Sequence, residues 1–487
     1  MQFTAYTNII SEVHKGIYTC KKASDGGLNA WLAFVAVTII CLLNPQSKAV
    51  AGEENMSALR LRPELRVLSA FALNYEDDAI PFDSNTDTFD WIRLRLIAEG
   101  RPAEWFSFEI HASQDMIMAT NELARYLDIE EQYEGARIHV LFDRPCGMFL
   151  EEHIDASMLF FMQPLKMYRL ADVRWRWEDK DHLRASLGLE RLNLAFHTRV
   201  TDARIGRQVI DFGGEWLWSP LDIFEPFDPR QFDRDHRYGV DAVRLDFFLG
   251  HHIGLTLVGA GGYLEPNLEN GKHSGLTWYG SAAIGRLEGR FESFSFAVQG
   301  GKVSAGYQAG GEISGRTGIL ELKAQASYFI AADQEILPDH ASAVAGIGLQ
   351  PMSNLRVTLE YRFNEAVDQE DIFSWIYGRI CGFCLHRAEH MLGLHLDWQV
   401  SESFSATLLA LAEIPDAGWL QPGLSYRASD NLELSVGAML PLEGRPGISL
   451  IASHSSDPSS LLIHYLIPRS ELGTYPSFFF LQLKLIG

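Results

Sequence analysis

Arginine residues spaced two positions apart recur along the sequence and offer anion-binding chemistry. Arg93 and Arg95 form one such pair, and Arg174 and Arg176 form another. In an extended chain this spacing places both side chains on one face. A guanidinium group binds carboxylate or phosphate through two parallel hydrogen bonds, so such a face can select anions. The candidate residues of an anion pathway are Arg93, Arg95, Arg174, Arg176, Arg184, Arg207, Arg244, Lys323, Arg356 and Arg362.

Acidic residues in the same segments allow a second interpretation, in which the cations pair across neighbouring strands and brace the sheet. The candidate partners are Asp172, Glu178, Asp246, Glu321, Glu360 and Asp397. Both interpretations, bracing pairs and a ring of unpaired arginines, remain open from the sequence.

The segment "CGFCLHRAEH" is the other local feature with possible chemistry. Cys381 and Cys384 are followed by His386 and His390, but structural zinc sites usually separate their ligand pairs by a longer finger. Covalent haem attachment needs a histidine directly after the second cysteine, where Leu385 stands. A small disulfide between Cys381 and Cys384 is the favoured interpretation, with a metal site or no role as alternatives.

Most of the chain that must position these residues alternates with period two. In "LRVTLEYRFN", residues 355–364, apolar and polar side chains alternate over the full length, which predicts a β-strand. Similar segments are 92–99, 172–178, 183–189, 203–211, 240–248, 253–259, 278–287, 291–299, 318–329, 341–349, 392–400, 404–413, 418–427, 432–440 and 478–485. Many end in turn sequences, so we expect 18 to 20 mostly antiparallel strands.

The distribution of aromatic and charged residues favours a membrane barrel over a soluble sandwich. Trp175, Trp177, Trp278 and Trp398 lie near strand ends on the apolar face, as in the aromatic girdles of outer-membrane barrels. The opposite face is rich in arginines and acids, which suits a wet lumen. Strands span lipid only when the sheet closes. The expected fold is therefore all-β, a closed antiparallel transmembrane β-barrel of about 18 strands with long loops.

The ends of the chain bound the expected domain. Lysines precede the apolar run 30–43, and "AVA" at 49–51 fits signal-peptidase cleavage after Ala51. We expect a signal peptide at 1–51, with a membrane anchor as the alternative, and one barrel domain at 52–487. Long loops or plug material are expected near 116–170, 216–238 and 364–390, where alternation is absent.

The net charge excludes one class of partner. The formal charge of −22 becomes about −24 once four lysines and two acids of the signal peptide are removed. A chain this acidic is a poor nucleic-acid binder. The three cysteines of the mature part are too few for a disulfide scaffold.

The glycine-rich stretch "RIGRQVIDFGGEWLWSP", residues 204–220, lacks the spacing and the helix of a phosphate-binding loop. It is better interpreted as a strand, 203–211, followed by a turn. Because Ile205, Arg207 and Val209 share a phase, Arg207 would face lipid unless a bulge at Gly206 redirects it into the lumen.

This stretch, continued by "DRDHRYGVDAVRLDF", resembles the alginate-export family of outer-membrane barrels and related porin-like proteins. The matching residues are Gly206, Arg207, Gln208, Phe212, Gly213, Trp218, Arg237, Asp241 and Arg244. The resemblance implies an 18-stranded barrel with an arginine-lined pore through which an anionic polymer or solute passes passively. The insert "SPLDIFEPFDPRQFD" departs from the family pattern.

These observations predict a passive outer-membrane channel for anionic solutes or an anionic polysaccharide, with no cofactor, no metal and no enzymatic activity. Expected partners are the lipid bilayer, the solute, the barrel-insertion machinery, which would recognise the closing strand "FFFLQLKLI", and periplasmic export proteins. The alternatives are a non-transporting structural or adaptor barrel and, third, an outer-membrane barrel enzyme.

Overall fold

The computed structural model describes residues 59–73, 86–120, 168–171, 173–180, 182–213, 217–224, 228–230, 236–262, 276–332, 338–366, 388–414, 417–442, 448–452, 464–468, 472 and 477–487. The predicted signal peptide, Cys381 and Cys384, and most of the segment 116–170 lie outside these ranges.

The described chain forms β-strands joined by turns and irregular segments. The strands are β1 (Arg60–Leu73), β2 (Thr86–Ala103), β3 (Phe106–Ala119), β4 (Arg174–Lys180), β5 (Leu183–His197), β6 (Thr201–Gln208), β7 (Val240–Phe248), β8 (Ile253–Gly262), β9 (Thr277–Arg290), β10 (Phe294–Val303), β11 (Gly306–Thr317), β12 (Leu320–Ala331), β13 (His340–Met352), β14 (Leu355–Asn364), β15 (His390–Gln399), β16 (Phe404–Glu413), β17 (Ala417–Ser429), β18 (Leu432–Leu442), β19 (Ile448–Ala452), β20 (His464–Pro468) and β21 (Ser477–Ile486). Within these ranges, no helix is long and apolar enough to cross a membrane.

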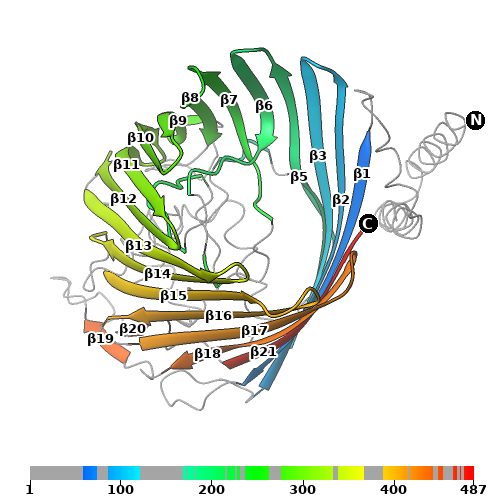
Figure 1. Ribbon diagram of the computed structural model, residues 1–487. Helices are drawn as coiled ribbons and strands as arrows, with labels where there is room; N and C mark the ends of the chain where they lie inside the picture. Colours follow the sequence, from blue (N-terminus) through cyan, green and yellow to red (C-terminus); the bar gives the residue numbers. More distant parts are fainter. Residues whose placement is uncertain are drawn as a thin grey trace, which may run out of the picture.

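Nineteen of the strands form one closed sheet (Figure 1). Each strand pairs antiparallel with its neighbours, and β1 closes the ring by pairing with both β2 and β21. Strands β19 and β20 pair only with each other. Among the described residues, closure gives every strand of the ring except β4 a partner on both edges, and paired backbone groups are the condition for strands in lipid.

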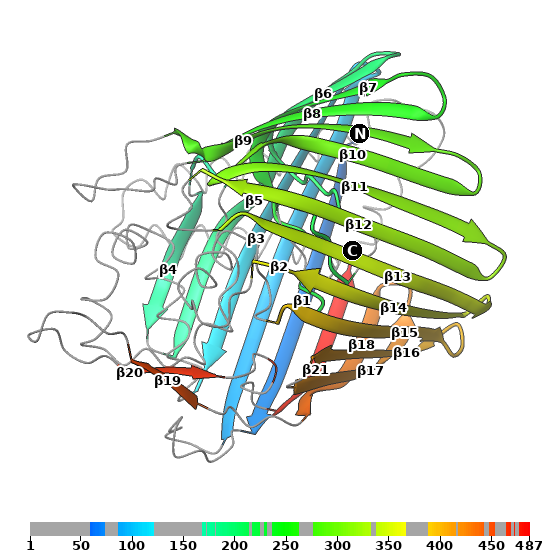
Figure 2. The same ribbon diagram turned by 90° about the vertical axis from the view of Figure 1, so that its left-hand side faces the viewer.

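The ring has 18 wall positions because β4 and β6 share one. Strand β3 pairs along nearly the whole of one edge of β5. On the other edge, β4 pairs with residues 183–188 and β6 pairs with residues 192–197. The two short strands therefore follow each other along β5, and Figure 2 shows them toward its opposite ends. The predicted closed barrel of about 18 strands is confirmed.

The two rims of the barrel differ. At one rim, short turns join β2 to β3, β5 to β6, and the later strands pair by pair up to β17 and β18 (Figure 2). At the other rim most connections are long, including 120–173 and 209–239. Outer-membrane barrels place short turns in the periplasm and long loops outside. Strand β1 begins and β21 ends at the short-turn rim.

The outer face carries an apolar belt with aromatic rings near both rims. Aliphatic side chains such as Leu257, Val298 and Leu424 are 40–58% exposed on it. Exposed aromatic residues near the short-turn rim are Trp105, Phe196, Phe291, Phe294, Trp398, Phe404 and Tyr426, and those near the other rim are Phe71, Trp278, Tyr307, Tyr328, Tyr361 and Phe479. An apolar band flanked by two aromatic girdles is the surface of a barrel that spans an outer membrane.

Five strands, β1, β3, β11, β19 and β20, lie outside the segments predicted from alternation. Strand β11 contains four glycines, which have no side chain to mark a face, and β3 carries polar residues in both phases. The predicted long loops 116–170 and 364–390 also overlap the neighbouring strands: both begin too early, and the second ends too late. Residues 116–119 belong to β3, Asn364 ends β14 and His390 begins β15.

Candidate functional site

The described residues between β6 and β7, 209–213, 217–224, 228–230 and 236–239, lie inside the barrel, and we call them the inner loop (Figure 1). Lumen-facing side chains of β14, β12, β11 and β10 bind successive residues of its central part. Glu360 accepts from the Leu217 N–H (3.0 Å) and Gln325 accepts from the Ser219 hydroxyl (2.7 Å). Gln308 donates to the Pro220 carbonyl (3.0 Å) and Gln299 donates to the Leu221 carbonyl (2.8 Å). The inner loop thus follows the wall across four strands.

Glycines in the wall make room for this loop. A Cβ atom at Gly310 of β11 would come within 2.7 Å of the Leu221 side chain. One at Gly393 of β15 would come within 2.6 Å of Leu217 and 2.8 Å of Trp218. Both contacts are closer than carbon atoms approach, so the loop can lie this near only because these positions lack a side chain.

Apolar packing fixes the loop against the strands β7 to β12. The buried loop residues Ile210, Phe212, Ile223 and Phe224 form one cluster with Tyr168 and the wall. The Phe224 ring meets those of Tyr168 and Phe212 edge-on at 5.2 and 5.8 Å. The wall residues of the cluster are Val240, Ala242, Val258, Ala260, Ala282, Ile284, Val303, Ala305 and Phe329. We call this the apolar side of the lumen.

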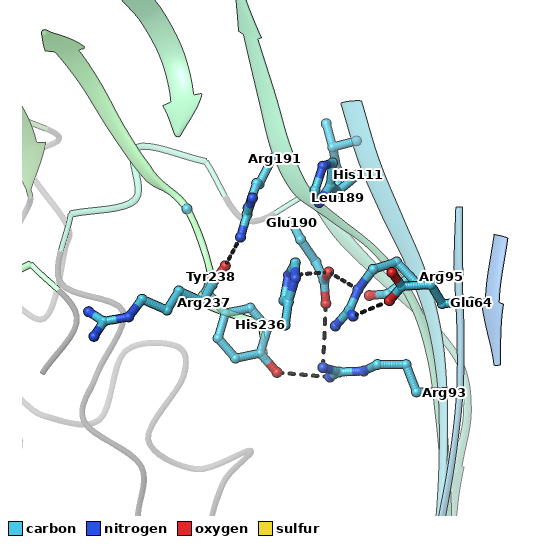
Figure 3. A network of polar contacts seen from close by, with 12 residues as sticks. Glu64, Arg93, Arg95, His111, Leu189, Glu190, Arg191, His236, Arg237 and Tyr238 are labelled. Carbon is cyan, nitrogen blue, oxygen red and sulfur yellow. Dashed lines mark hydrogen bonds and ion pairs between the residues drawn. The ribbon is translucent and has the colours of Figure 1, made fainter. Parts of the chain in front are cut away.

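A buried charge cluster occupies the wall formed by β1, β2, β3 and β5 (Figure 3). Glu190 of β5, whose side chain is 4% exposed, lies between Arg93 and Arg95 of β2. Its Oε2 accepts from Arg95 Nε at 3.0 Å. Arg95 also binds Glu64 at 3.1 Å, and Arg93 binds Asp115 at 2.5 Å. We call this the charged side of the lumen.

The end of the inner loop docks on the charged side. The Tyr238 hydroxyl accepts from Arg93 at 2.8 Å, and His236 Nε2 lies 2.7 Å from Glu190 Oε2 (Figure 3). Burial lowers the pKa of His236, although the contact with Glu190 opposes the shift. Burial raises the pKa of Tyr238, so the hydroxyl stays neutral. The two sides together hold the loop from opposite directions.

Of the predicted pathway residues, Arg93 and Arg95 are central to the charged side, and Arg207 lies within the wall. Arg207 is 5% exposed and binds Asp241 through two nitrogens, at 2.8 and 2.9 Å. It also donates to the carbonyls of Leu189 and Ala171, at the point along β5 where β6 ends and the chain leading to β4 approaches. Its guanidinium therefore takes over hydrogen bonding where the strand ladder is interrupted.

The predicted bulge at Gly206 takes a different form. The pairing of β6 with β5 and β7 continues through this residue without a shift of register. Gly206 instead has a φ of +112°, and a Cβ there would collide with the Leu192 carbonyl. The positive φ, which glycine alone adopts easily, redirects Arg207.

The other predicted cations also have partners. Arg244 binds Asp246 at 2.8 Å, and Glu321 lies 3.3 Å from Arg356 and 3.6 Å from Lys323. Arg362 donates to the Ala388 carbonyl at 3.3 Å. Arg174, Arg176 and Arg184 likewise take part in polar or electrostatic interactions. Glu360, an expected bracing partner, binds the inner loop instead. A role for these cations in a solute pathway stays a prediction.

The residues of the family resemblance gather where the inner loop leaves and rejoins the wall. Gln208 is fully buried and donates to the Ala242 carbonyl at 2.9 Å. Arg237 binds Asp222 and lies 3.3 Å from Asp211, joining the two ends of the loop. The remaining motif residues, Gly206, Gly213, Trp218 and Asp241, lie in β6, in the loop and at the start of β7.

Sequence reasoning missed Glu190, although a signal was present. The apolar residues of β5 change phase from Leu187 and Leu189 to Leu192 and Leu194. Pairing with β3 shows the cause, since the register shifts between His111 and Ala112 and leaves Glu190 as an extra residue. Such a bulge directs both Glu190 and Arg191 toward the lumen. The change of phase marks this position in the sequence.

Comparisons with known proteins give similarity of architecture alone. No protein-family model and no curated protein matches the sequence. Among solved structures, OccD3 (OpdP) of Pseudomonas aeruginosa is 8% identical, over 90% of this chain and 93% of that one, with a TM-score of 0.47. A BenF-like porin of Pseudomonas fluorescens is 9% identical, over 88% of this chain and 98% of that one, with a TM-score of 0.47. The outer membrane protein opdK of Pseudomonas aeruginosa is 8% identical, over 88% and 98% of the two chains, with a TM-score of 0.46.

Proposed function

We propose that this protein is a passive outer-membrane channel whose lumen is narrowed by the inner loop. The observation that carries the proposal is the closed ring of 18 positions with an apolar outer face and charged side chains inside. A wall of this kind needs no cofactor, because the width of the lumen and its charges decide which solutes pass.

The solutes that we propose are anionic. Arg93 and Arg95 on the charged side, with Arg244, Arg356 and Lys323 on other strands, supply the fixed positive charge along the wall. Each cation has an acidic neighbour, so we expect a passing carboxylate to exchange with that neighbour rather than meet a free guanidinium. The resemblance to the alginate-export family makes an anionic polysaccharide one candidate.

Single-channel recording in planar bilayers tests this proposal. We expect an ohmic current and, in a salt gradient, a reversal potential of the sign that anion selectivity gives. Arg356→Gln should reduce the selectivity because Arg356, with its side chain 37% exposed, is the more accessible member of its pair with Glu321. Arg290→Gln is the matched control, since Arg290 lies at the same rim but its side chain is 79% exposed, where bulk solvent screens its charge.

Two outcomes would contradict the proposal in different ways. A cation-selective current would support the channel function but contradict the proposal that its solutes are anionic. A folded barrel that carries no current would contradict the channel function and favour the structural or adaptor barrel. The apolar packing inside the lumen would then explain why no current flows.

A further inference from the structure

Two carboxylates and an imidazole meet on the lumen face of β2 and β3, toward the short-turn rim. Glu99 of β2 and Glu109 of β3 stand directly opposite each other in the strand pairing. His111 lies two residues beyond Glu109 and shares its face. One ligand atom from each of the three lies within 4.8 Å of the others.

The polar atoms of this group are incompletely satisfied. Like charges directly opposite each other on neighbouring strands are destabilising, so this pair calls for a cation between them. Within the described ranges, the side chain of Glu99 forms no hydrogen bond or ion pair, while its backbone is paired in the sheet. His111 is 3% exposed, its Nδ1 has no hydrogen-bond partner among the described residues, and its Nε2 meets only the Glu109 carboxylate. A buried ring nitrogen without a partner is costly.

Glu109 is held in place by side chains that leave it able to bind a further group. Arg191 donates to its Oε1 at 3.0 Å, and Asn193 donates to its Oε2 at 3.0 Å. Carboxylates that bind metal ions are usually oriented by such hydrogen bonds. Arg191 is the one cation in direct contact with the group among the described residues, and it also donates to the Arg237 carbonyl, which fixes its direction.

The spacing fits chelation better than a hydrogen bond. His111 Nε2 lies 2.9 Å from Glu109 Oε1 without hydrogen-bond geometry. Two ligand atoms of a tetrahedral zinc ion lie about 3.3 Å apart when each bond is near 2 Å. A small movement would therefore bring both atoms onto one ion. An imidazole nitrogen with two carboxylates is a donor set for zinc rather than for calcium or magnesium, which take oxygen ligands.

We propose that Glu99, Glu109 and His111 bind a divalent transition-metal ion of the zinc class, with water as the fourth ligand. The two glutamates are partly exposed, so the ion enters from the lumen, while the buried His111 supplies the nitrogen. The ion separates the opposed carboxylates and satisfies one of the two ring nitrogens. The site stands on the wall itself and does not depend on what the channel transports.

Calorimetric titration of the folded full-length barrel in detergent, with Zn²⁺ alone as the ligand, tests the site. Co²⁺ in its place gives an absorption spectrum that reports nitrogen ligation. We expect one equivalent to bind, and His111→Gln and Glu99→Gln each to weaken binding at least about tenfold. His111→Cys should retain binding and shift the Co²⁺ spectrum, because thiolate also ligates these ions. His395→Gln is the matched control, since His395 is a partly buried histidine on β15.

The proposal is overturned if the wild-type barrel binds no Zn²⁺ at about 1 mM or if His111→Gln and Glu99→Gln bind as wild type does. Migration of unheated samples on gels reports folding of each variant. Should His111→Gln fail to fold, Glu99→Gln decides the question, since Glu99 is partly exposed and its replacement relieves a repulsion rather than leaving a cavity.

Discussion

The charged side and the apolar side of the lumen hold the same loop by different forces. On the charged side, Arg93 forms a hydrogen bond with Tyr238, and Glu190 forms an ion-pair contact with His236. All four groups are buried and polar, and their contacts depend on direction. On the apolar side, Phe224 and its neighbours pack against apolar residues of the wall between β7 and β12. Directed contacts fix a position but fail if one member is lost, whereas packing tolerates replacement by a residue of similar volume.

The difference assigns separate roles to the two sides. Burying charged side chains in the lumen wall costs free energy. On the charged side, Arg93, Arg95 and Glu190 are nevertheless present as ion pairs, where apolar residues would avoid this cost. The apolar side mainly fills space, although it also holds the buried Arg286, which pairs with Glu312 and lies 5.2 Å from the centre of the Phe212 ring. Variants of each side test whether this division holds.

The largest effect is expected for Glu190→Ala. Its removal leaves Arg93 and Arg95 buried beside fewer acidic partners, and breaking a buried ion pair costs about 3–5 kcal/mol. Urea unfolding in lipid vesicles measures the loss. Glu402→Ala, in the exposed turn between β15 and β16, serves as the control and should change the unfolding free energy little. A wild-type value for Glu190→Ala would mean that the charged side does not stabilise the barrel.

Phe224→Ala should have the next largest effect, about 3 kcal/mol, because it opens a cavity among Tyr168, Phe212 and the wall. The released loop should also raise the single-channel conductance. Phe224→Leu retains most of the side-chain volume, so its free energy of unfolding and its single-channel conductance should both lie close to the wild-type values. If conductance stays unchanged while stability falls, the apolar side is packing alone and does not set the width of the passage.

Glu360→Gln weakens the attachment of the inner loop to β14. The carboxylate accepts from the N–H groups of Leu217 and Trp218, and a neutral acceptor binds them less strongly, by about 1.5 kcal/mol. Hydrogen exchange at these two amides should speed up accordingly. Exchange at the Leu221 amide, which Glu360 does not contact, provides the internal control. Equal acceleration at all three amides would show that the loop detaches as one unit.

The smallest expected effect is a dependence of stability on pH through His236. Burial lowers its pKa in the folded barrel, so the unfolded chain takes up a proton first as the pH falls through about 6.5. The contribution of His236 to the free energy of unfolding is complete above that pH and is lost below it. The free energy of unfolding then changes by at most about 1.4 kcal/mol per pH unit. Unfolding midpoints at several pH values, compared with His236→Gln, measure it. A variant with the wild-type slope would assign the dependence to other groups.

Alternation in the sequence was sufficient to predict the barrel, because its outer face meets lipid and its inner face meets water over most strands. Strand β14 shows this over all ten residues. The rule fails where the inner face meets protein instead. Gly310 and Gly393 are glycines because the inner loop approaches them, and this depends on contacts with Leu221 and Leu217 far away in the sequence.

The candidate site was predictable in part. The spacing of Arg93 and Arg95 identified the charged side, but their partner Glu190 lies about 95 residues away at a bulge. Arg207 was recognised as anomalous from its phase alone. Its contacts with Ala171 and Leu189 depend on how β4 and β6 divide one edge of β5, which no local pattern encodes.

The wall position shared by β4 and β6 links the architecture of the barrel to that of the passage. The Ala119 N–H donates to the His182 carbonyl, so β3 and β5 meet as an ordinary hairpin would, and residues 120–181 are an insertion at its tip. Strand β6 ends early because the chain turns inward as the inner loop, and β4, brought by the insertion, fills the gap left in the wall. The insertion and the inner loop thus depend on each other. Without the insertion, part of the β5 edge would lack a partner strand, and without the inner loop, a longer β6 would compete with β4 for that edge.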